Sequence, residues 1–207
     1  MGRLVKFYNS NLAPNPRRVR IFLAEKGLAL PTVNVDLGRL EQRTAEYSAV
    51  NPFQQIPALE LDDGTVITES IAICRYLEEL HPDPNLFGAS PLERAVVEMW
   101  QRRIELQLLA PIAFAFRHSH PAMKAMEDPQ VPEWAVVSRA KALKAMEIFD
   151  RLLADRPFAA GERFTVADIT GLVALDWTRP ARIAIPEHFE NLNRWRRTLS
   201  ARPSAAA

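Results

Sequence analysis

The chain has 207 residues, 48% hydrophobic and 25% charged, which is the composition of a globular protein with one large or two small domains. A formal net charge of +1 gives no bulk field that would favour nucleic acid or an anionic membrane as a partner. With one cysteine, no apolar stretch near the roughly 18 residues of a membrane span and no signal-peptide pattern, the sequence predicts a cytoplasmic protein without internal disulfides or a multi-cysteine metal site.

The chain begins with alternating strand and helix patterns. Residues 4–8 are short, apolar and β-rich, which predicts a strand, and turn residues follow as far as Asn15. Pro16 then opens a helical pattern, since its missing N–H costs nothing in a first turn, and Gly27 is a helix C-cap signal. A second strand is predicted at 32–35. Strand, helix and strand in about 30 residues predict a unit with two parallel strands.

The following predicted elements are a short helix at 44–50, strands at 58–61 and 66–68, and a helix at 70–80. Asp63-Gly64 is a hairpin turn signal, because the turn needs a positive φ that glycine adopts freely. Pro57 has no N–H for a ladder, so it belongs at a strand start, and the Ile56-Pro57 bond is a candidate cis peptide. A bent backbone there exposes peptide groups that could bind another peptide as an added strand.

The composition changes after the proline-rich segment 81–85. Beyond it the sequence predicts helices at 91–116 with a kink at Pro111, at 134–153, at 166–177 and at 191–199. Thr165 and Asp168 form a capping box at the start of the third of these helices. The fold class is therefore α/β plus all-α, with a thioredoxin-like domain at 1–82 and an all-helical domain at 90–207.

Several short motifs in this order resemble a cytosolic glutathione S-transferase. They are Gln55-Ile56-Pro57, Glu69-Ser70 at a helix start, and the succession of a thioredoxin-like and an all-helical domain. The stretch 14–20 is similar to a bacterial and fungal subgroup of that family that lacks the usual catalytic hydroxyl. The resemblance implies glutathione as co-substrate, no metal, small hydrophobic electrophiles, and a homodimer with Phe53 as an interface anchor.

Glutathione carries two carboxylates, one amine and a thiol, and the resemblance implies a place for each charged end. Ser70 would offer its hydroxyl and N–H to the γ-glutamyl carboxylate, and Glu69 would take the amine; an N-terminal cap without a ligand is the alternative. Ile56 would pair its backbone with the cysteinyl part, whereas the alternative for Pro57 is an ordinary edge-strand proline. The candidates for the glycyl carboxylate are Gln42, Arg43 and Gln55. A solvated loop cation is the alternative for Arg43.

The side chain that the family usually employs to activate the thiol is missing or displaced. A free thiol has a pKa of about 8.5 and the thiolate is the nucleophile, so the family lowers that pKa with a Tyr, Ser or Cys after the first strand. By the spacing of Ser-type members, this place falls on Ala13. Tyr8 is expected to be packed in the strand, and Ser10 is a possible donor three residues away. Asn15 either caps the next helix or donates to sulfur, beside the positive helix end.

A second group of candidates for thiol activation follows the first long helix. The resemblance implies that this region overhangs the thiol and holds a water in place of the hydroxyl. His118 and His120 are two residues apart, so they point to different sides, and one of them would hold the water or act as base. The alternative is two surface histidines in a loop.

An apolar electrophile pocket is expected between the first loop and the kinked helix. Its candidate residues are Leu12, Ile112, Phe114, Phe116 and Trp134, and for most of them a place in the core is the alternative. Cys74 lies on the apolar side of its predicted helix, which indicates an inert buried thiol.

The sequence thus predicts a detoxifying glutathione transferase, in which the thiolate attacks an electrophilic carbon by halide displacement or addition to an activated double bond. One alternative is a glutathione-dependent reductase or peroxidase, although no cysteine lies near Ala13 for disulfide exchange. The other is a non-catalytic protein that carries hydrophobic ligands.

Overall fold

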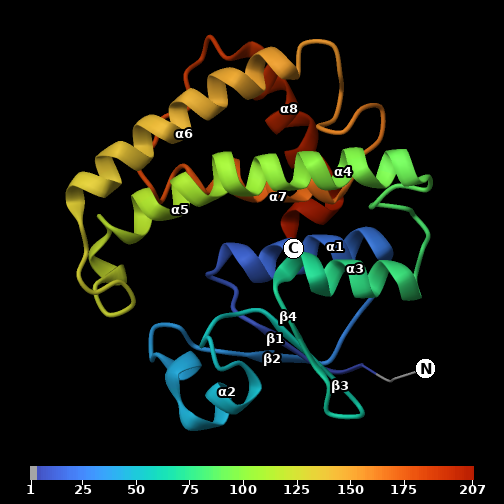
Figure 1. The fold of residues 1–207 in the computed structure, drawn as a ribbon, viewed down its shortest axis with the longest axis vertical. Helices are drawn as coiled ribbons and strands as arrows, with labels where there is room; N and C mark the ends of the chain where they lie inside the picture. Colours follow the sequence, from blue (N-terminus) through green and yellow to red (C-terminus); the bar gives the residue numbers. More distant parts are fainter. Residues whose placement is uncertain (1–3) are drawn as a thin grey trace. The chain divides into compact units, whose positions relative to one another are not determined.

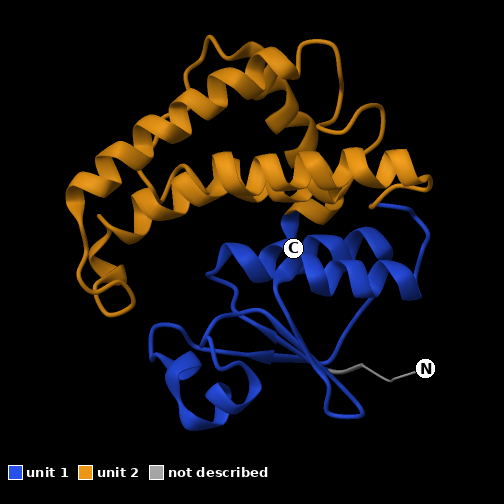
Figure 2. Ribbon diagram, in the orientation of Figure 1, with its two compact units in different colours: residues 1–86, 206–207 blue, residues 87–205 orange. Residues whose placement is uncertain are grey.

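The computed structural model describes residues 4–207, with backbone alone for residues 4 and 5. The chain separates into two compact units, which Figure 2 shows in different colours. Unit 1 contains the residues up to 86 together with 206–207, and unit 2 contains 87–205. Unit 1 holds the sheet, whereas the regular structure of unit 2 is helical.

Unit 1 is built on a four-stranded sheet in the order β2-β1-β3-β4. The strands are β1 (Leu4–Asn9), β2 (Thr32–Asn34), β3 (Ala58–Leu61) and β4 (Val66–Thr68). β1 pairs parallel with β2 and antiparallel with β3, with Tyr8 opposite Val33 on one side and Ala58 on the other. β3 and β4 form the predicted hairpin, whose turn residue Gly64 has a φ of 84°. The predicted thioredoxin-like arrangement is confirmed.

Helices cover both faces of this sheet (Figure 1). They are α1 (Pro14–Lys26), α2 (Ala45–Val50) and α3 (Ser70–Leu80), and the 3-10 turn Glu41–Arg43 leads into α2. α1 and α3 lie side by side on one face, while α2 lies on the other side. The wholly buried Phe7, Phe22, Leu59 and Leu77 fill the space beneath α1 and α3. On the α2 side, a second apolar cluster contains Tyr8, Val35, Tyr47, Ile56 and Ala58. This second cluster fixes Ile56 at the entrance to β3.

Unit 2 consists of α4 (Pro91–Ile104), α5 (Ala110–Arg117), α6 (Pro132–Leu152), α7 (Val166–Trp177) and α8 (Glu190–Ser200). The predicted long helix 91–116 is interrupted by a π-helical turn over Glu105–Leu109. Pro111 follows directly and lies in the first turn of α5. Because proline removes one helical hydrogen bond and crowds the preceding turn, a widened turn before it relieves the clash that a straight helix would contain. The interruption therefore lies just before the predicted kink.

α7 is the buried centre of unit 2, and residues 166–175 are all buried. The predicted capping box is present: Asp168 accepts hydrogen bonds from the Thr165 N–H (2.9 Å) and the Ala159 N–H (2.8 Å). The indole Nε1 of Trp195 on α8 donates to the same carboxylate at 2.9 Å. Burial raises the pKa of Asp168 to about 6. One buried carboxylate thus ties α7 to α8 and to the preceding loop.

Within residues 4–207, no helix combines the length and apolar character needed to cross a membrane.

Candidate active site

The loop between β1 and α1 carries Ala13, where the family's hydroxyl is expected. Ala13 is extended (φ −111°, ψ 143°) and is the N-cap of α1, so the helix begins at Pro14, two residues before the predicted start. The Ala13 N–H donates to the Ser10 carbonyl at 3.3 Å. Since Pro14 and Pro16 have no N–H, Asn15 supplies the one N–H of this first turn that has no intramolecular partner among the described residues.

The interpretation of Asn15 as a helix cap is wrong, because Asn15 lies inside α1 rather than before it. Its Oδ1 accepts a hydrogen bond from Nη2 of Arg18 at 2.9 Å. The Asn15 side chain is therefore held along the helix, while its backbone N–H remains at the helix start. Of the two roles that the sequence left open for Asn15, capping the helix and donating to sulfur, only the second remains, and the backbone N–H is the group that could fill it.

Tyr8 and Ser10 are both buried, with exposed fractions of 8% and 5%. The Tyr8 hydroxyl donates to Oε2 of Glu60 at 2.7 Å. Burial, followed by this hydrogen bond and the charge of Glu60, raises the pKa of Tyr8 to about 12. Tyr8 is therefore packed, as expected, and its proton is committed to Glu60.

A polar network that sequence reasoning missed holds the end of β1. Asn9 is 2% exposed, and its Nδ2 donates to Oδ1 of Asn34 at 2.8 Å and of Asn11 at 2.9 Å. Arg20 of α1 donates through Nη1 to Asn9 Oδ1 (2.7 Å) and to the Ser10 carbonyl (3.1 Å). Partners 11 and 25 residues apart form no local motif, so this network could not be predicted from the sequence.

Arg20 brings a positive charge to the β1–α1 loop. Within the described residues its guanidinium donates hydrogen bonds to neutral oxygens and pairs with no carboxylate. Burial, and then the positive charge of Arg17, lowers the pKa of Arg20. An uncompensated, half-buried cation stabilises anions in its neighbourhood more than a paired cation does.

The Ile56-Pro57 peptide is cis, as the sequence suggested. The preceding carbonyl of Gln55 accepts from the Tyr47 hydroxyl and from Asn51 Nδ2, both at 2.7 Å. Ile56 is 8% exposed, and among residues 4–207 no hydrogen bond involves its peptide N–H or C=O. The Gln55 side chain is exposed. The segment is thus held rigidly by its neighbours and leaves a backbone donor and acceptor unused.

The start of α3 is strained and uncapped. Glu69 occupies the N-cap position with φ 66° and ψ 119°, and in the described chain its side chain makes no capping hydrogen bond. Ser70, the first helical residue, is 3% exposed. A positive φ at a non-glycine residue costs about 1–3 kcal/mol, persists where the surrounding structure enforces it, and occurs often at functional sites. Neither Glu69 nor Ser70 therefore caps α3 through its side chain, as the alternative interpretation of the Glu69-Ser70 motif would require.

The two remaining candidates of unit 1 lie in the turn before α2. Gln42 is 4% exposed, whereas Arg43 is exposed to solvent. Both belong to the 3-10 turn Glu41–Arg43.

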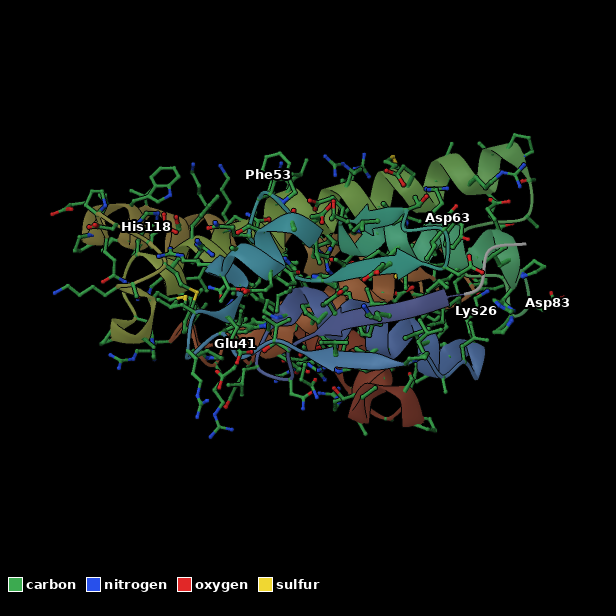
Figure 3. The ribbon with its side chains drawn as sticks, turned by 90° about the horizontal axis from the view of Figure 1, so that it is seen from below. Lys26, Glu41, Phe53, Asp63, Asp83 and His118 are labelled. Carbon is green, nitrogen blue, oxygen red and sulfur yellow. The ribbon has the colours of Figure 1, made fainter. Side chains whose placement is uncertain are left out.

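The two candidate histidines of unit 2 lie in the loop after α5 and have different partners. His118 Nδ1 accepts from the Val131 N–H at 3.2 Å, and its Nε2 lies 3.6 Å from Oε1 of Glu127. His120 Nδ1 accepts from the Ala122 N–H at 3.2 Å. Each ring is therefore oriented by a backbone donor to Nδ1. Nε2 of His118 faces the Glu127 carboxylate, whereas Nε2 of His120 has no hydrogen bond among the described residues. Figure 3 labels His118.

Of the expected pocket residues, Ile112 belongs to the core because it is wholly buried. Phe114 and Trp134 are 42% and 37% exposed, and their ring centroids are 6.3 Å apart. Phe116 packs edge-on against Trp177 at 5.0 Å. Leu12 of unit 1 is 82% exposed. Unit 2 thus presents an aromatic surface from α5 and α6.

Cys74 is wholly buried, and burial raises the pKa of its thiol to about 12. It is inert, as expected. Among the described residues, no group of three or more His, Cys, Asp or Glu side chains is placed to hold a metal ion.

A thioredoxin-like sheet unit followed by an all-helical unit is the domain organisation that the sequence predicts for a glutathione transferase. Residues 13–80 match the glutathione S-transferase N-terminal domain, and residues 113–203 match the C-terminal domain. The chain therefore belongs to the glutathione S-transferase family and is an enzyme of this type.

Individual relatives agree with this assignment. The chain is 39% identical to glutathione S-transferase 2 of Saccharomyces cerevisiae, over 99% of this chain and 89% of that protein. It resembles the crystal structure of Gtt2 from Saccharomyces cerevisiae with a TM-score of 0.93 and 38% identity, covering 98% of this chain and 99% of that one. A glutathione S-transferase domain-containing protein of Marinobacter aquaeolei gives a TM-score of 0.93 and 41% identity, covering 97% and 99%.

Proposed function

We propose that this transferase binds glutathione along the edge of unit 1 and adds its thiolate to hydrophobic electrophiles without a side-chain hydroxyl at the sulfur. The observation that carries the proposal is the set of unused backbone donors at the starts of α1 and α3 and at Ile56, with Ala13 where the hydroxyl is expected. These donors match the carboxylate, peptide and thiol groups of a tripeptide.

The γ-glutamyl end binds at the start of α3. The first-turn N–H groups of this helix, among them that of Ser70, have no intramolecular partner in the described chain. They point along the positive end of the helix dipole and suit a carboxylate. The exposed carboxylate of Glu69 takes the amine as a charged hydrogen bond.

The rest of the tripeptide extends along the sheet edge. The cysteinyl residue pairs with the N–H and C=O of Ile56 as an added strand, and Pro57 fixes the bend that exposes them. The glycyl carboxylate is bound by one of the amide or guanidinium side chains of Gln42, Arg43 and Gln55.

The thiol is activated by charge and backbone donors rather than by a hydroxyl. The Asn15 N–H donates to sulfur at the start of α1, and the unpaired charge of Arg20 favours the thiolate. Ser10, buried beside them, is a further donor candidate. His118 and His120 of unit 2 remain the candidates for holding a water in place of the hydroxyl.

The test is the ultraviolet absorbance of bound glutathione thiolate as a function of pH. We expect a thiol pKa well below about 8.5 in the wild type. His118→Ala or His120→Ala raises it if that ring holds the water. His188→Ala, which changes another histidine of unit 2, leaves it unchanged. Bound glutathione with an unshifted thiol pKa in the wild type contradicts the proposal.

A carrier without turnover is the second candidate, and the absence of a hydroxyl at Ala13 favours it. Turnover of a generic halogenated electrophile separates the two. A disulfide reductase is disfavoured, because the one cysteine is buried with a raised pKa.

We also propose that the enzyme is a cytoplasmic homodimer that serves detoxification. Phe53 is 78% exposed and points outward from the loop after α2 (Figure 3). An isolated, exposed aromatic ring suits insertion into a pocket of a second subunit. Phe53→Ser is expected to shift the sedimentation equilibrium from dimer to monomer, whereas Leu92→Ser, at another exposed apolar residue, is not.

A further inference from the structure

Unit 2 contains a hollow that none of the glutathione-binding candidates line. It has a volume of about 500 Å³ and lies between the turn after α7 and the face of α8. Its lining residues are Thr178, Arg179, Arg182, Ile183, Ala184, Ile185, Asn193 and Arg196. Figure 1 shows the segment that joins α7 to α8. The volume is within the usual range of small-molecule sites.

The lining is strongly positive, although the whole chain has a net charge of only +1. Arg179 and Arg182 have no carboxylate or other side-chain partner among the described residues. Arg196 has a single long contact with Asp176, at 3.5 Å and on the surface. The described lining itself contains no carboxylate, whereas an adjoining hollow that shares Ile185 and Asn193 is also lined by Glu187 and Glu190.

Arg182 lines the hollow as an exposed residue and occupies an unusual backbone conformation. Its φ is 56°, in the left-handed region that favours glycine. The Arg182 N–H donates to the Arg179 carbonyl and the Ile183 N–H to the Thr178 carbonyl, which is the hydrogen-bond pattern that ends a helix with a glycine. Glycine would make this turn without strain, so the arginine side chain itself is the feature that needs an explanation.

The other polar side chains of the wall donate hydrogen bonds within the protein. Asn193 Nδ2 donates to the carbonyls of Pro186 (3.0 Å) and Phe189 (2.9 Å), which fixes the loop before α8. The Thr178 hydroxyl donates to the Leu175 carbonyl at 2.6 Å. Ile183 is buried and contributes apolar surface. The side-chain hydrogen-bond donors left for a ligand are therefore guanidinium groups.

We propose that this hollow binds a small anion with two or more negatively charged oxygens, of the phosphate-ester or polycarboxylate class. Guanidinium groups bind such anions through paired, charge-assisted hydrogen bonds, and several guanidiniums around one hollow favour multivalent over monovalent anions. The site is separate from the thiol chemistry and does not depend on the proposed function.

The experiment is calorimetric titration of the intact protein with inorganic pyrophosphate and, separately, with citrate, at constant ionic strength. We expect saturable binding of one or both, with acetate as the monovalent comparison binding far more weakly. Preference for pyrophosphate assigns the phosphate-ester class, and preference for citrate assigns the polycarboxylate class. Saturating glutathione leaves the affinity unchanged, because the two sites are distinct.

Two variants locate the site. Arg179→Gln/Arg182→Gln is expected to weaken binding about tenfold or more, whereas Arg151→Gln, on the exposed side of α6, leaves it unchanged. Arg182→Gly removes the charge and relieves the backbone, so it should weaken binding while keeping or raising the melting temperature. The proposal is overturned if pyrophosphate and citrate still bind with wild-type affinity to both arginine variants. It is also overturned if glutathione displaces the bound anion, or if acetate binds with the same affinity.

Discussion

The starts of α1 and α3 face the same task, stabilising an anion at a helix N-terminus, but their sequences equip them differently. α3 begins Ser70-Ile71-Ala72, so each residue of its first turn has an N–H. α1 begins Pro14-Asn15-Pro16, so two of the three corresponding donors do not exist. The positive end of α3 thus offers all three first-turn N–H groups to an anion, whereas the positive end of α1 offers a single backbone N–H.

This difference shows that a helix terminus is only as good an anion site as the N–H groups it carries. The α3 start suits a permanently ionised carboxylate. The α1 start cannot by itself replace a hydroxyl at the thiol, and this is why a charged neighbour such as Arg20 matters in unit 1. The prolines of α1 rigidify the loop at the cost of donors.

The largest expected effect comes from breaking the contact that ties the two helices together. Lys26, at the end of α1, is fully buried, with Nζ 2.6 Å from Glu78 Oε2 on α3 and 2.8 Å from the His81 carbonyl. Lys26→Met leaves a buried carboxylate unpaired and should cost about 3–5 kcal/mol of unfolding free energy. Urea unfolding measures this.

The matched variant is Lys26→Met/Glu78→Leu, in which both charges are removed. It should lose clearly less stability than the sum of the two single variants, since each single variant leaves a lone buried charge and the double variant leaves none. Additive losses would show that the pair does not couple α1 to α3. Glutathione affinity well below the melting temperature should change little in any folded variant.

The next largest effect is expected from a variant in which α3 begins with the same Pro-X-Pro pattern as α1. Ser70→Pro/Ala72→Pro removes two N–H groups and the hydroxyl, each a charge-assisted donor worth about 1.5–3 kcal/mol. Glutathione affinity should therefore fall about a thousandfold or more, measured by calorimetry. Ala72→Ser retains every N–H and should keep the wild-type affinity. Tight binding by a folded double-proline variant would remove α3 from the site.

The fold was largely predictable because its signals are local. The hairpin turn Asp63-Gly64, the Gly27 cap and the Thr165–Asp168 capping box each lie within a few residues, and each is present in the structure. The start of α1 was misplaced because Pro16 and Pro14 are equally good first-turn residues and the sequence gives no reason to prefer the earlier one.

The candidate site was predictable only where it is local. The bend at Ile56-Pro57 and the helix start at Ser70 have sequence signatures. The Asn9–Arg20 network has none, because its members meet only after β1, β2 and α1 have assembled. Likewise, the strain at Glu69 is a property of its backbone conformation, which the residue type does not predict.

A smaller effect tests whether Arg20 compensates for the missing donors of α1. Arg20→Gln removes a positive charge near the loop. Because this loss disfavours the thiolate, the thiol pKa of bound glutathione should rise by about half a unit to one unit. Arg20→Lys keeps the charge and should preserve most of the shift. The pH profile of thiolate absorbance measures both. Equal rises in the two variants would assign Arg20 a purely structural role.

The smallest expected effect is the reverse of the α3 experiment. Pro14→Ala/Pro16→Ala gives α1 back two N–H groups at its positive end, each worth about 0.3 kcal/mol to a nearby anion at the low end of the usual range. Because 1.36 kcal/mol corresponds to one pKa unit, the thiol pKa should fall by about half a unit. Pro31→Ala, an exposed loop proline, controls for the general effect of losing a proline. A thiol pKa that stays the same in a folded variant would mean that the sulfur does not lie at the start of α1, and the activation would then belong to Arg20 and the histidines of unit 2.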